Sequence, residues 1–295
     1  MKIGSTPIHS LSHPVALEKG VSLYVKREDL NHEHMSGNKL RKLKYNLLEA
    51  RKRQQKTILT FGGAFSNHIY ATAAAGKAYG FQTIAIIRGE EHLPLNPTLQ
   101  FARDQGMLLY YLDRTRYRSK HMPIILDDLR ERFGDFYLIP EGGTNELAIQ
   151  GCQEILSDDE LQFDYYALSV GTGGTIGGII QRLKGKQLVL GFSALKGGFL
   201  EEEIKNLFKQ YNLPQFTNWD IHNDYHFGAY AKATPDLMAF IKNMESAFDL
   251  PLDPVYTAKA LYGLLDMIEQ GAFPEGSSLL FIHTGGLQGR AGFGL

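Results

Sequence analysis

A glycine-rich turn is the first feature of the sequence that could bind a charged group. In the run SVGTGGTIGGI, an apolar segment passes into a helical pattern through Gly171, Thr172, Gly173, Gly174 and Thr175. Glycines let backbone N–H groups close around an anion, and the N-terminus of the following helix adds partial positive charge. Taken alone, the turn fits a phosphate site and a purely structural tight turn equally well.

Two nucleotide motifs fit this turn poorly. The dinucleotide fingerprint G-x-G-x-x-G requires glycine where Ile176 stands. The next predicted strand ends in Ser193 and Ala194, so no acidic residue is available for a ribose. The P-loop pattern G-x-x-x-x-G-K-[ST] does not occur here either. The phosphate of another kind of ligand is therefore the functional alternative.

Lys39 is a candidate nucleophile. It follows Gly37 and Asn38 at the start of a helical pattern. A lysine that forms a Schiff base must be partly desolvated and unprotonated, and a helix N-terminus disfavours its ammonium form. The alternative is an ordinary surface lysine, which is the default for any one lysine of this chain.

The run GGAFSNH places three polar side chains directly after a Gly-Gly turn. Ser66 can serve as a helix N-cap, with Asn67 and His68 in the first helical turn. The same side chains could bind a substrate carboxylate or a cofactor hydroxyl. Capping alone is the structural alternative, and a lone histidine in such a place is more often structural than catalytic.

Short apolar runs and helical patterns alternate along the chain around these motifs. Such alternation is typical of βαβ units around a mostly parallel sheet. Ligands of open α/β sheets bind beyond the carboxyl ends of the strands, where the glycine-containing turns are expected. The predicted strands are 21–26, 57–61, 83–88, 107–112, 165–170, 187–192 and 279–283, and the predicted helices are 38–53, 66–79, 97–105, 122–133, 145–156, 175–183, 200–211, 235–248 and 257–270.

The helix predicted from Asn38 carries the densest basic cluster, RKLKYNLLEARKRQQK. A nucleic-acid-binding face is one interpretation. We favour a buried stripe of Leu40, Leu43, Leu47 and Leu48 with the lysines and arginines facing water, because the net charge of the chain is −1.

Composition argues against several other classes of protein. The chain has 295 residues, of which 43% are hydrophobic and 21% are charged, as in a globular enzyme of about two domains. Its charge predicts neither a nucleic-acid nor a membrane partner. Cys152 is the lone cysteine, so neither a disulfide nor a cysteine-based zinc site is expected, and no metal site is predicted. The polar start and the lack of a long apolar run predict a cytoplasmic protein.

Six runs occur together in an order that resembles one family. They are KREDLNHEHMSGNKLRKLKYNL, FGGAFSNH, IPEGGTNELAIQG, SVGTGGTIGGI, DPVYTAKALYGLLDMI and LFIHTGG. The chain thereby resembles the 1-aminocyclopropane-1-carboxylate (ACC) deaminases and D-cysteine desulfhydrases, which depend on pyridoxal phosphate. The resemblance extends from about residue 5 to about residue 286, and SGNKLRKLKY and DPVYTAKA are its most specific parts.

The resemblance implies a role for each candidate residue. Lys39 matches the lysine that binds the cofactor covalently, and the turn at 171–175 matches the phosphate cradle. Asn67 matches an asparagine on the phenolic oxygen of the cofactor, while Ser66 and His68, with Asn67, match residues that meet the substrate. Three further matches are two active-site tyrosines and a residue near the pyridine nitrogen, namely Tyr230, Tyr256 and Thr284.

The resemblance also implies an α/β fold like that of the tryptophan synthase β subunit, with two domains built on open, mostly parallel sheets. A larger, cofactor-binding domain would combine residues 1–45 and 150–295. A smaller inserted domain would span residues 46–149 and bring Ser66, Asn67 and His68 to the cleft. The dimerising habit of the family predicts a homodimer.

Departures from the family pattern decide the expected substrate. ACC deaminases carry glutamate after the tyrosine of DPVY, where it pairs with the pyridine nitrogen. Thr257 stands there in this chain, as in D-cysteine desulfhydrases, and a hydroxyl leaves the ring a weaker electron sink. We therefore expect β-elimination from D-cysteine to pyruvate, ammonia and sulfide. ACC deamination to 2-oxobutanoate and ammonia, or another specificity on the same cofactor, are the alternatives, because Ala229 and Ala231 replace the glycines that flank the first tyrosine in the family.

Overall fold

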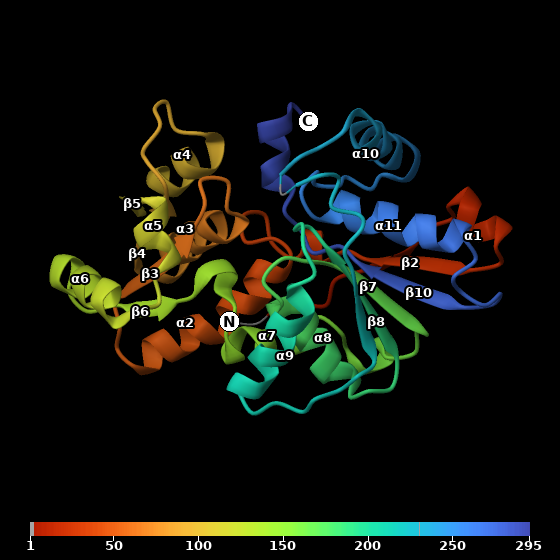
Figure 1. The fold of residues 1–295 in the computed structure, drawn as a ribbon, viewed down its shortest axis with the longest axis horizontal. Helices are drawn as coiled ribbons and strands as arrows, with labels where there is room; N and C mark the ends of the chain where they lie inside the picture. Colours follow the sequence, from red (N-terminus) through yellow and green to blue (C-terminus); the bar gives the residue numbers. More distant parts are fainter. Residues whose placement is uncertain (1–2, 230) are drawn as a thin grey trace.

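The computed structural model describes residues 3–229 and 231–295 and contains two sheets covered by helices (Figure 1). The larger sheet has the strand order β1-β2-β10-β7-β8-β9, and the smaller one has the order β5-β4-β3-β6. All neighbouring strands are parallel except β1 and β2. The strands are β1 (Ile8–Ser10), β2 (Ser22–Lys26), β3 (Thr57–Gly62), β4 (Gln82–Arg88), β5 (Leu108–Leu112), β6 (Tyr137–Ile139), β7 (Tyr165–Val170), β8 (Leu188–Ser193), β9 (Trp219–His222) and β10 (Ser278–Ile282).

Helices lie on both faces of each sheet, as the βαβ alternation requires. They are α1 (Pro14–Glu18), α2 (Asn38–Lys52), α3 (Asn67–Tyr79), α4 (Pro97–Asp104), α5 (Arg114–Arg118), α6 (Pro123–Phe133), α7 (Glu146–Gln153), α8 (Gly174–Leu183), α9 (Leu200–Gln210), α10 (Pro235–Phe248) and α11 (Thr257–Glu269). Short 3-10 helices are η1 (Glu28–Leu30), η2 (Glu141–Gly143), η3 (Asp158–Glu160) and η4 (Leu287–Phe293). The predicted α/β architecture with mostly parallel sheets is confirmed.

The larger sheet is apolar on both faces because neither faces water. One face packs against α1, α10 and α11 and contributes Val25, Phe192 and Phe281 to that core. The opposite face packs against α8 and α9 and contributes Leu168 and Ile282. Central strands that are buried on both faces explain why these segments read as continuous apolar runs in the sequence.

The smaller sheet is built in the same way. Helices α2 and α3 cover one face, and their Leu43 and Ala75 pack on Ile58 and Ile139 of the sheet. Helices α5 and α6 cover the other face, where Phe61 lies in the core. Strands β3 and β7 of the two sheets end in the two turns that carry the predicted polar motifs.

Every predicted strand and helix is present, with small differences at the ends. The sequence did not reveal β1, β6 and β9, which have three or four residues, or α1 and α5, which have five. Elements of this length contain too few residues to show a periodic pattern. The domain limits at residues 46 and 149 stay a prediction; the first falls within α2 and the second within α7.

The prediction that the basic residues of α2 face water is wrong for Arg41 and Lys42, which are both buried. Arg41 donates to both carboxylate oxygens of Glu28, at 2.9 and 2.8 Å. Leu48, expected in the buried stripe, is exposed, whereas Leu40, Leu43 and Leu47 are buried as predicted. No helix in the described part of the chain is long and apolar enough to cross a membrane.

Candidate active site

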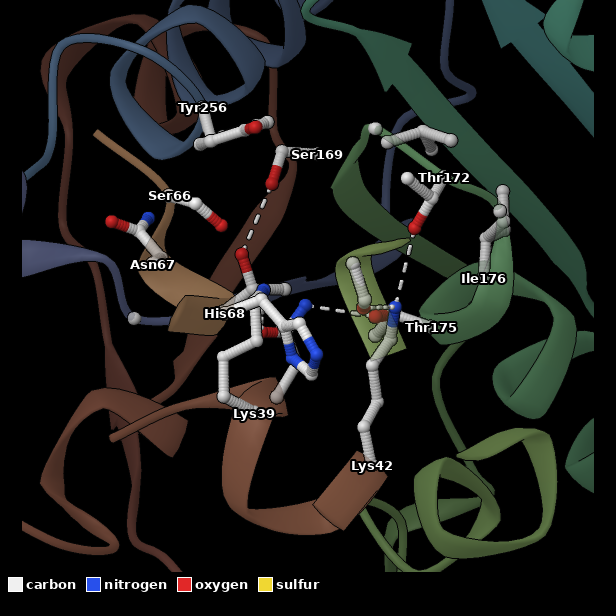
Figure 2. A pocket seen from close by; sticks show the side chains of 17 residues that line it. Lys39, Lys42, Ser66, Asn67, His68, Ser169, Thr172, Thr175, Ile176 and Tyr256 are labelled. Carbon is white, nitrogen blue, oxygen red and sulfur yellow. Dashed lines mark hydrogen bonds between the residues drawn. The ribbon is translucent and has the colours of Figure 1, made fainter. Parts of the chain in front are cut away.

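A cavity lies where strands of both sheets end, and most of the predicted polar motifs line it (Figure 2). Segments that follow β3 and β6 reach it from the smaller sheet, and segments that follow β7 and β10 reach it from the larger one. The N-terminus of α2 forms another part of its wall. The cavity is lined by Asn38, Lys39, Lys42, Ser66, Asn67, His68, Gly142, Ser169, Val170, Gly171, Thr172, Gly173, Thr175, Ile176, Tyr256, Thr284 and Gly285.

Lys39 has the properties that a nucleophilic amine needs. It lies in the first turn of α2, and its Nζ donates to Oδ1 of Asn38 at 2.7 Å. Burial, together with the neighbouring Lys42 ammonium, lowers its pKa to about 7. In a large fraction of the molecules the Lys39 amine is therefore neutral at physiological pH. A neutral amine can attack a carbonyl carbon.

The position of Lys39 depends on a close backbone contact. Gly37 has φ +71°, and a Cβ atom on it would lie 2.0 Å from the carbonyl oxygen of Thr284. The N–H of Asn38 donates to that same oxygen at 3.1 Å. Glycine at position 37 therefore lets the start of α2 lie against the turn after β10, and this brings Lys39 and Thr284 to one cavity.

The turn between β7 and α8 has the form of an anion site. Gly173 has φ +76°, a conformation that glycine adopts without strain. A Cβ atom on Gly174 would lie 2.9 Å from Oγ1 of Thr144 and 3.1 Å from Nζ of Lys42. Asn38 fixes the end of the turn by donating to Oγ1 of Thr175 at 2.8 Å. The backbone N–H groups of the first turn of α8 are thus available beside a cation.

Lys42 is a site residue that the sequence analysis missed. Its Nζ donates to the carbonyl oxygen of Gly142 and to Oγ1 of Thr144, both at 3.0 Å, and lies 3.4 Å from Oγ1 of Thr172. Burial lowers its pKa to about 8. The signal in the sequence is the spacing of three residues from Lys39, which places both lysines on one helical face.

The motif at residues 66–68 opens α3 at the edge of the cavity. Ser66 is the N-cap and accepts from the N–H of Ile69 at 3.3 Å. Asn67 lies beside the turn after β10, because a Cβ atom on Gly286 would be 2.9 Å from its Nδ2. In Figure 2 the side chains of Ser66 and Asn67 lie on the same side of the cavity as Tyr256.

His68 is buried and neutral. Its Nε2 lies 2.9 Å from Oγ1 of Thr60, and that hydroxyl donates to the carbonyl oxygen of Ile139 at 2.8 Å. The hydroxyl has one proton, so Nε2 of His68 is the donor to it. Burial and the charges of Lys39 and Lys42 hold the pKa of His68 well below its ordinary value. Its Nδ1 has no hydrogen-bond partner in the described part of the chain.

Thr257 is not among the residues that line the cavity, in contrast to the expectation. It is fully buried, and its hydroxyl donates to Oδ1 of Asp253 at 2.8 Å. Asp253 also accepts from the N–H groups of Val255, Tyr256 and Thr257, so it organises the first turn of α11. Tyr256 itself lines the cavity, and Asp253 is a positioning residue that the sequence analysis overlooked.

Two hydroxyls of the cavity wall lie close together. Oγ of Ser169, near the end of β7, is 3.0 Å from Oγ1 of Thr284, which follows β10 (Figure 2). Thr284 was predicted as a site residue and Ser169 was not. Tyr230 lies outside the described residues.

The charges around the cavity have one sign. Lys39 and Lys42 line it, whereas the described lining residues include no aspartate or glutamate. A cavity with a reactive amine, an anion-binding turn and a second cation fits a phosphorylated aldehyde, whose carbonyl the amine can attack while the turn holds its phosphate.

Comparison with known proteins gives matches over most of the chain. A family model described as "Pyridoxal-phosphate dependent enzyme" matches residues 1–285. A protein of Arabidopsis thaliana named bifunctional D-cysteine desulfhydrase/1-aminocyclopropane-1-carboxylate deaminase, mitochondrial, is 34% identical and covers 96% of this chain and 77% of its own. The D-cysteine desulfhydrase of Klebsiella pneumoniae is 27% identical over 90% of this chain and 87% of its own. A crystal structure of an ACC deaminase homologue matches with a TM-score of 0.84 and 30% identity, over 99% and 92% of the two chains.

Proposed function

The chain belongs to the family of pyridoxal-phosphate dependent enzymes, and we propose that it is a deaminating lyase that converts D-cysteine to pyruvate, ammonia and sulfide. Relatives of 34% and 27% identity carry D-cysteine desulfhydrase in their names. We also propose that the protein is a homodimer, which rests on the family resemblance. We propose further that it is cytoplasmic, which rests on the sequence features given above. Molar mass by light scattering tests the first of these.

The lining residues fit pyridoxal phosphate. Lys39 would hold its aldehyde carbon, the turn at 171–175 with Lys42 would hold its phosphate, and Asn67 its phenolic oxygen. The hydroxyls of Ser169 and Thr284 would meet its ring nitrogen. When bound, this cofactor supplies an electron sink for the charge that develops when Cα of an amino acid loses a proton.

The lack of a carboxylate among the described lining residues is the observation that carries the choice of reaction. A carboxylate beside the ring nitrogen would keep that nitrogen protonated, whereas two hydroxyls do not. The electron sink is then moderate. Loss of a thiolate from Cβ tolerates a moderate sink, because thiolate is a good leaving group, but opening a cyclopropane ring does not.

The chain's own groups then have separate tasks. The hydroxyl of Ser66 and the free N–H groups at the start of α3 can bind the substrate carboxylate. Lys39, with a pKa of about 7, can take the proton from Cα as a general base at neutral pH. Tyr256, which lies on the same side of the cavity as Ser66 (Figure 2), can deliver or receive a proton there. The positive charge of Lys42 keeps anionic groups in place at the turn.

ACC deamination is the second candidate, and several relatives favour it: a Pyrococcus abyssi protein that is 34% identical is named putative 1-aminocyclopropane-1-carboxylate deaminase, and the matching crystal structure is that of an ACC deaminase homologue. The Arabidopsis relative carries both activities in its name. The same cavity could therefore serve both reactions, with the balance set by the groups around the ring nitrogen.

A parallel assay separates these functions. Purified protein with pyridoxal phosphate is given D-cysteine, L-cysteine, D-serine and ACC, and the release of pyruvate or 2-oxobutanoate is measured. We expect the highest kcat/KM for D-cysteine and loss of turnover in Lys39→Ala. Faster turnover of ACC than of D-cysteine would overturn the proposal in favour of the second candidate.

A further inference from the structure

Lys259 is a buried cation of α11 that the site described above does not use. Its side chain is 1% exposed. Its Nζ donates to the backbone carbonyl oxygens of His226 and Ala229, at 2.9 and 3.0 Å. Burial lowers its pKa to about 8, against the opposing influence of Asp253. Burying an ammonium group without acceptors costs free energy, and the hydrogen bonds to these two carbonyl groups offset that cost.

The segment that Lys259 binds has few other attachments among the described residues, one of which is the N–H of Lys232, which donates to the carbonyl oxygen of Ala229 at 3.2 Å. Residues 226–229 belong to neither a helix nor a strand, and Phe227 and Gly228 have φ angles of +52° and +95°. The N–H of Gly228 donates within the segment, to Nδ1 of His226 at 2.8 Å. The ring of Phe227 packs edge-on against Tyr262 at 5.1 Å. Since Tyr262 is three residues after Lys259, one face of α11 makes both attachments.

The same helix begins at the cavity. Tyr256 lies three residues before Lys259, and a Cβ atom on Gly171 would be 3.2 Å from its Cε1. Asp253 fixes this end of α11 through the N–H groups that it binds. In the sequence, residues 226–229 lead directly into Tyr230, the other tyrosine that the resemblance places in the active site.

We propose that Lys259 is a positioning residue, whose ammonium fastens residues 226–229 to the turn of α11 that follows Tyr256. Lys259 does not line the cavity, so it acts through the segment and not on the substrate. Residues 226–229 are thereby held against α11, the helix that begins beside Tyr256 in the cavity. This inference rests on the proposed function, because it assigns the segment to that active site.

Amide hydrogen exchange tests the attachment without any substrate. Lys259→Met removes the donors and keeps an unbranched side chain of similar length. We expect exchange in residues 226–232 to become about tenfold faster or more, the effect of losing a hydrogen bond from a charged group. Lys242→Met is the matched control, because Lys242 is exposed on α10. Equal exchange of this segment in wild type and Lys259→Met overturns the proposal.

Steady-state kinetics then test the role in the reaction. In Lys259→Met we expect kcat to fall about tenfold or more, while KM and the affinity for pyridoxal phosphate stay near wild type, because Lys39 and the turn at 171–175 lie elsewhere. In Lys259→Ala, which also covers the case of a poorly folded methionine variant, added ethylammonium should restore kcat. Unchanged kcat, or no rescue by ethylammonium, overturns the positioning role. An inactive wild type would instead refute the proposed function, and the exchange data would still decide the attachment.

Discussion

Lys39 has an amine whose pKa of about 7 depends on burial and on the charge of Lys42. Cofactor capture needs the neutral amine, so its rate should rise with pH through about 7 and level off above that value. In Lys42→Met the neighbouring positive charge is gone, the pKa of Lys39 rises, and the midpoint should move to higher pH. Stopped-flow absorbance of apoprotein mixed with pyridoxal phosphate across pH measures this. A midpoint that does not move would show that Lys42 has no influence on the amine.

Gly173 tests the phosphate site. Its φ of +76° disfavours a side chain, and a Cβ atom there would lie 3.0 Å from Cγ1 of Ile204. Gly173→Val should strain the turn by about 1–3 kcal/mol, which corresponds to a loss of about tenfold to hundredfold in affinity for pyridoxal phosphate. Titration of the apoprotein measures the affinity. Gly198→Val is the control, because position 198 faces open space; unchanged affinity in Gly173→Val would place the phosphate elsewhere.

Substitutions of Thr257 test whether its hydrogen bond to Asp253 stabilises the first turn of α11. Glutamate at this fully buried position would put a second carboxylate beside Asp253 and remove the hydroxyl that donates to it. We expect Thr257→Glu to lower the free energy of unfolding by about 3 kcal/mol or more, because it buries an unpaired charge. Thr257→Ser keeps the hydroxyl and should stay close to wild type. Urea denaturation measures both, and equal stability of Thr257→Glu and wild type would contradict the described role.

The residues at the cavity were predictable where a motif carried them. Lys39, the motif at 66–68 and the turn at 171–175 were found because glycines and a helix start mark them in the sequence. Ser169 was missed because a hydroxyl within an apolar strand carries no local signal. Lys42 was missed because its spacing of three residues from Lys39 does not stand out within a basic helix. Thr257 does not line the cavity, and sequence alone could not show that Asp253, four residues earlier, binds its hydroxyl.

Among the elements, α7 separates the two helices that bring the site's cations and its anion-binding turn. Gly151 of α7 meets α2, since a Cβ atom on it would lie 2.1 Å from the carbonyl oxygen of Arg41. Gly178 of α8 meets α7, where a Cβ atom would lie 2.4 Å from Cβ of Cys152. Close packing of these helices therefore sets the separation of Lys42 from the turn at 171–175.

Gly151→Ala is the variant that tests this packing. The added methyl group must push α2 away from α7, and overpacking of this kind costs about 1–3 kcal/mol of unfolding free energy. The affinity for pyridoxal phosphate should fall as well, because Lys42 moves with α2. Gly198→Ala should change neither property, since nothing lies within 4 Å of its added Cβ. The idea fails if denaturation and cofactor titration give the same values for Gly151→Ala and wild type.

At the scale of the elements, the sequence was enough to predict the long strands and helices. It was not enough to predict which strands pair with each other. Apolar runs predicted β3, β7 and β10 because these strands are buried on both faces. No pattern within β2 indicates that its neighbours are β1 and β10. That pairing depends on contacts between residues far apart in the chain, which no local window contains.

At the scale of the whole molecule, both sheets contribute residues to the cavity. One sheet is built from a continuous stretch of the chain and the other from two separate stretches. All strands of the smaller sheet lie between residues 57 and 139. The larger sheet takes β1 and β2 from before this stretch and the rest from after it (Figure 1). Neither sheet alone provides both Ser66 and the turn at 171–175, so the site exists only when both are complete.

The pairing of β2 with β10 has a consequence for biosynthesis. Ser22 pairs with Ser278 and Lys26 with Ile282, so β2 leaves the ribosome long before its partner is made. We expect nascent chains stalled before residue 278 to contain a protease-resistant smaller sheet while β2 is still open to cleavage. Resistance of β2 in such chains would refute this order. Until synthesis ends, one edge of β2 offers unpaired backbone groups to other chains, and that edge is what a chaperone would need to shield.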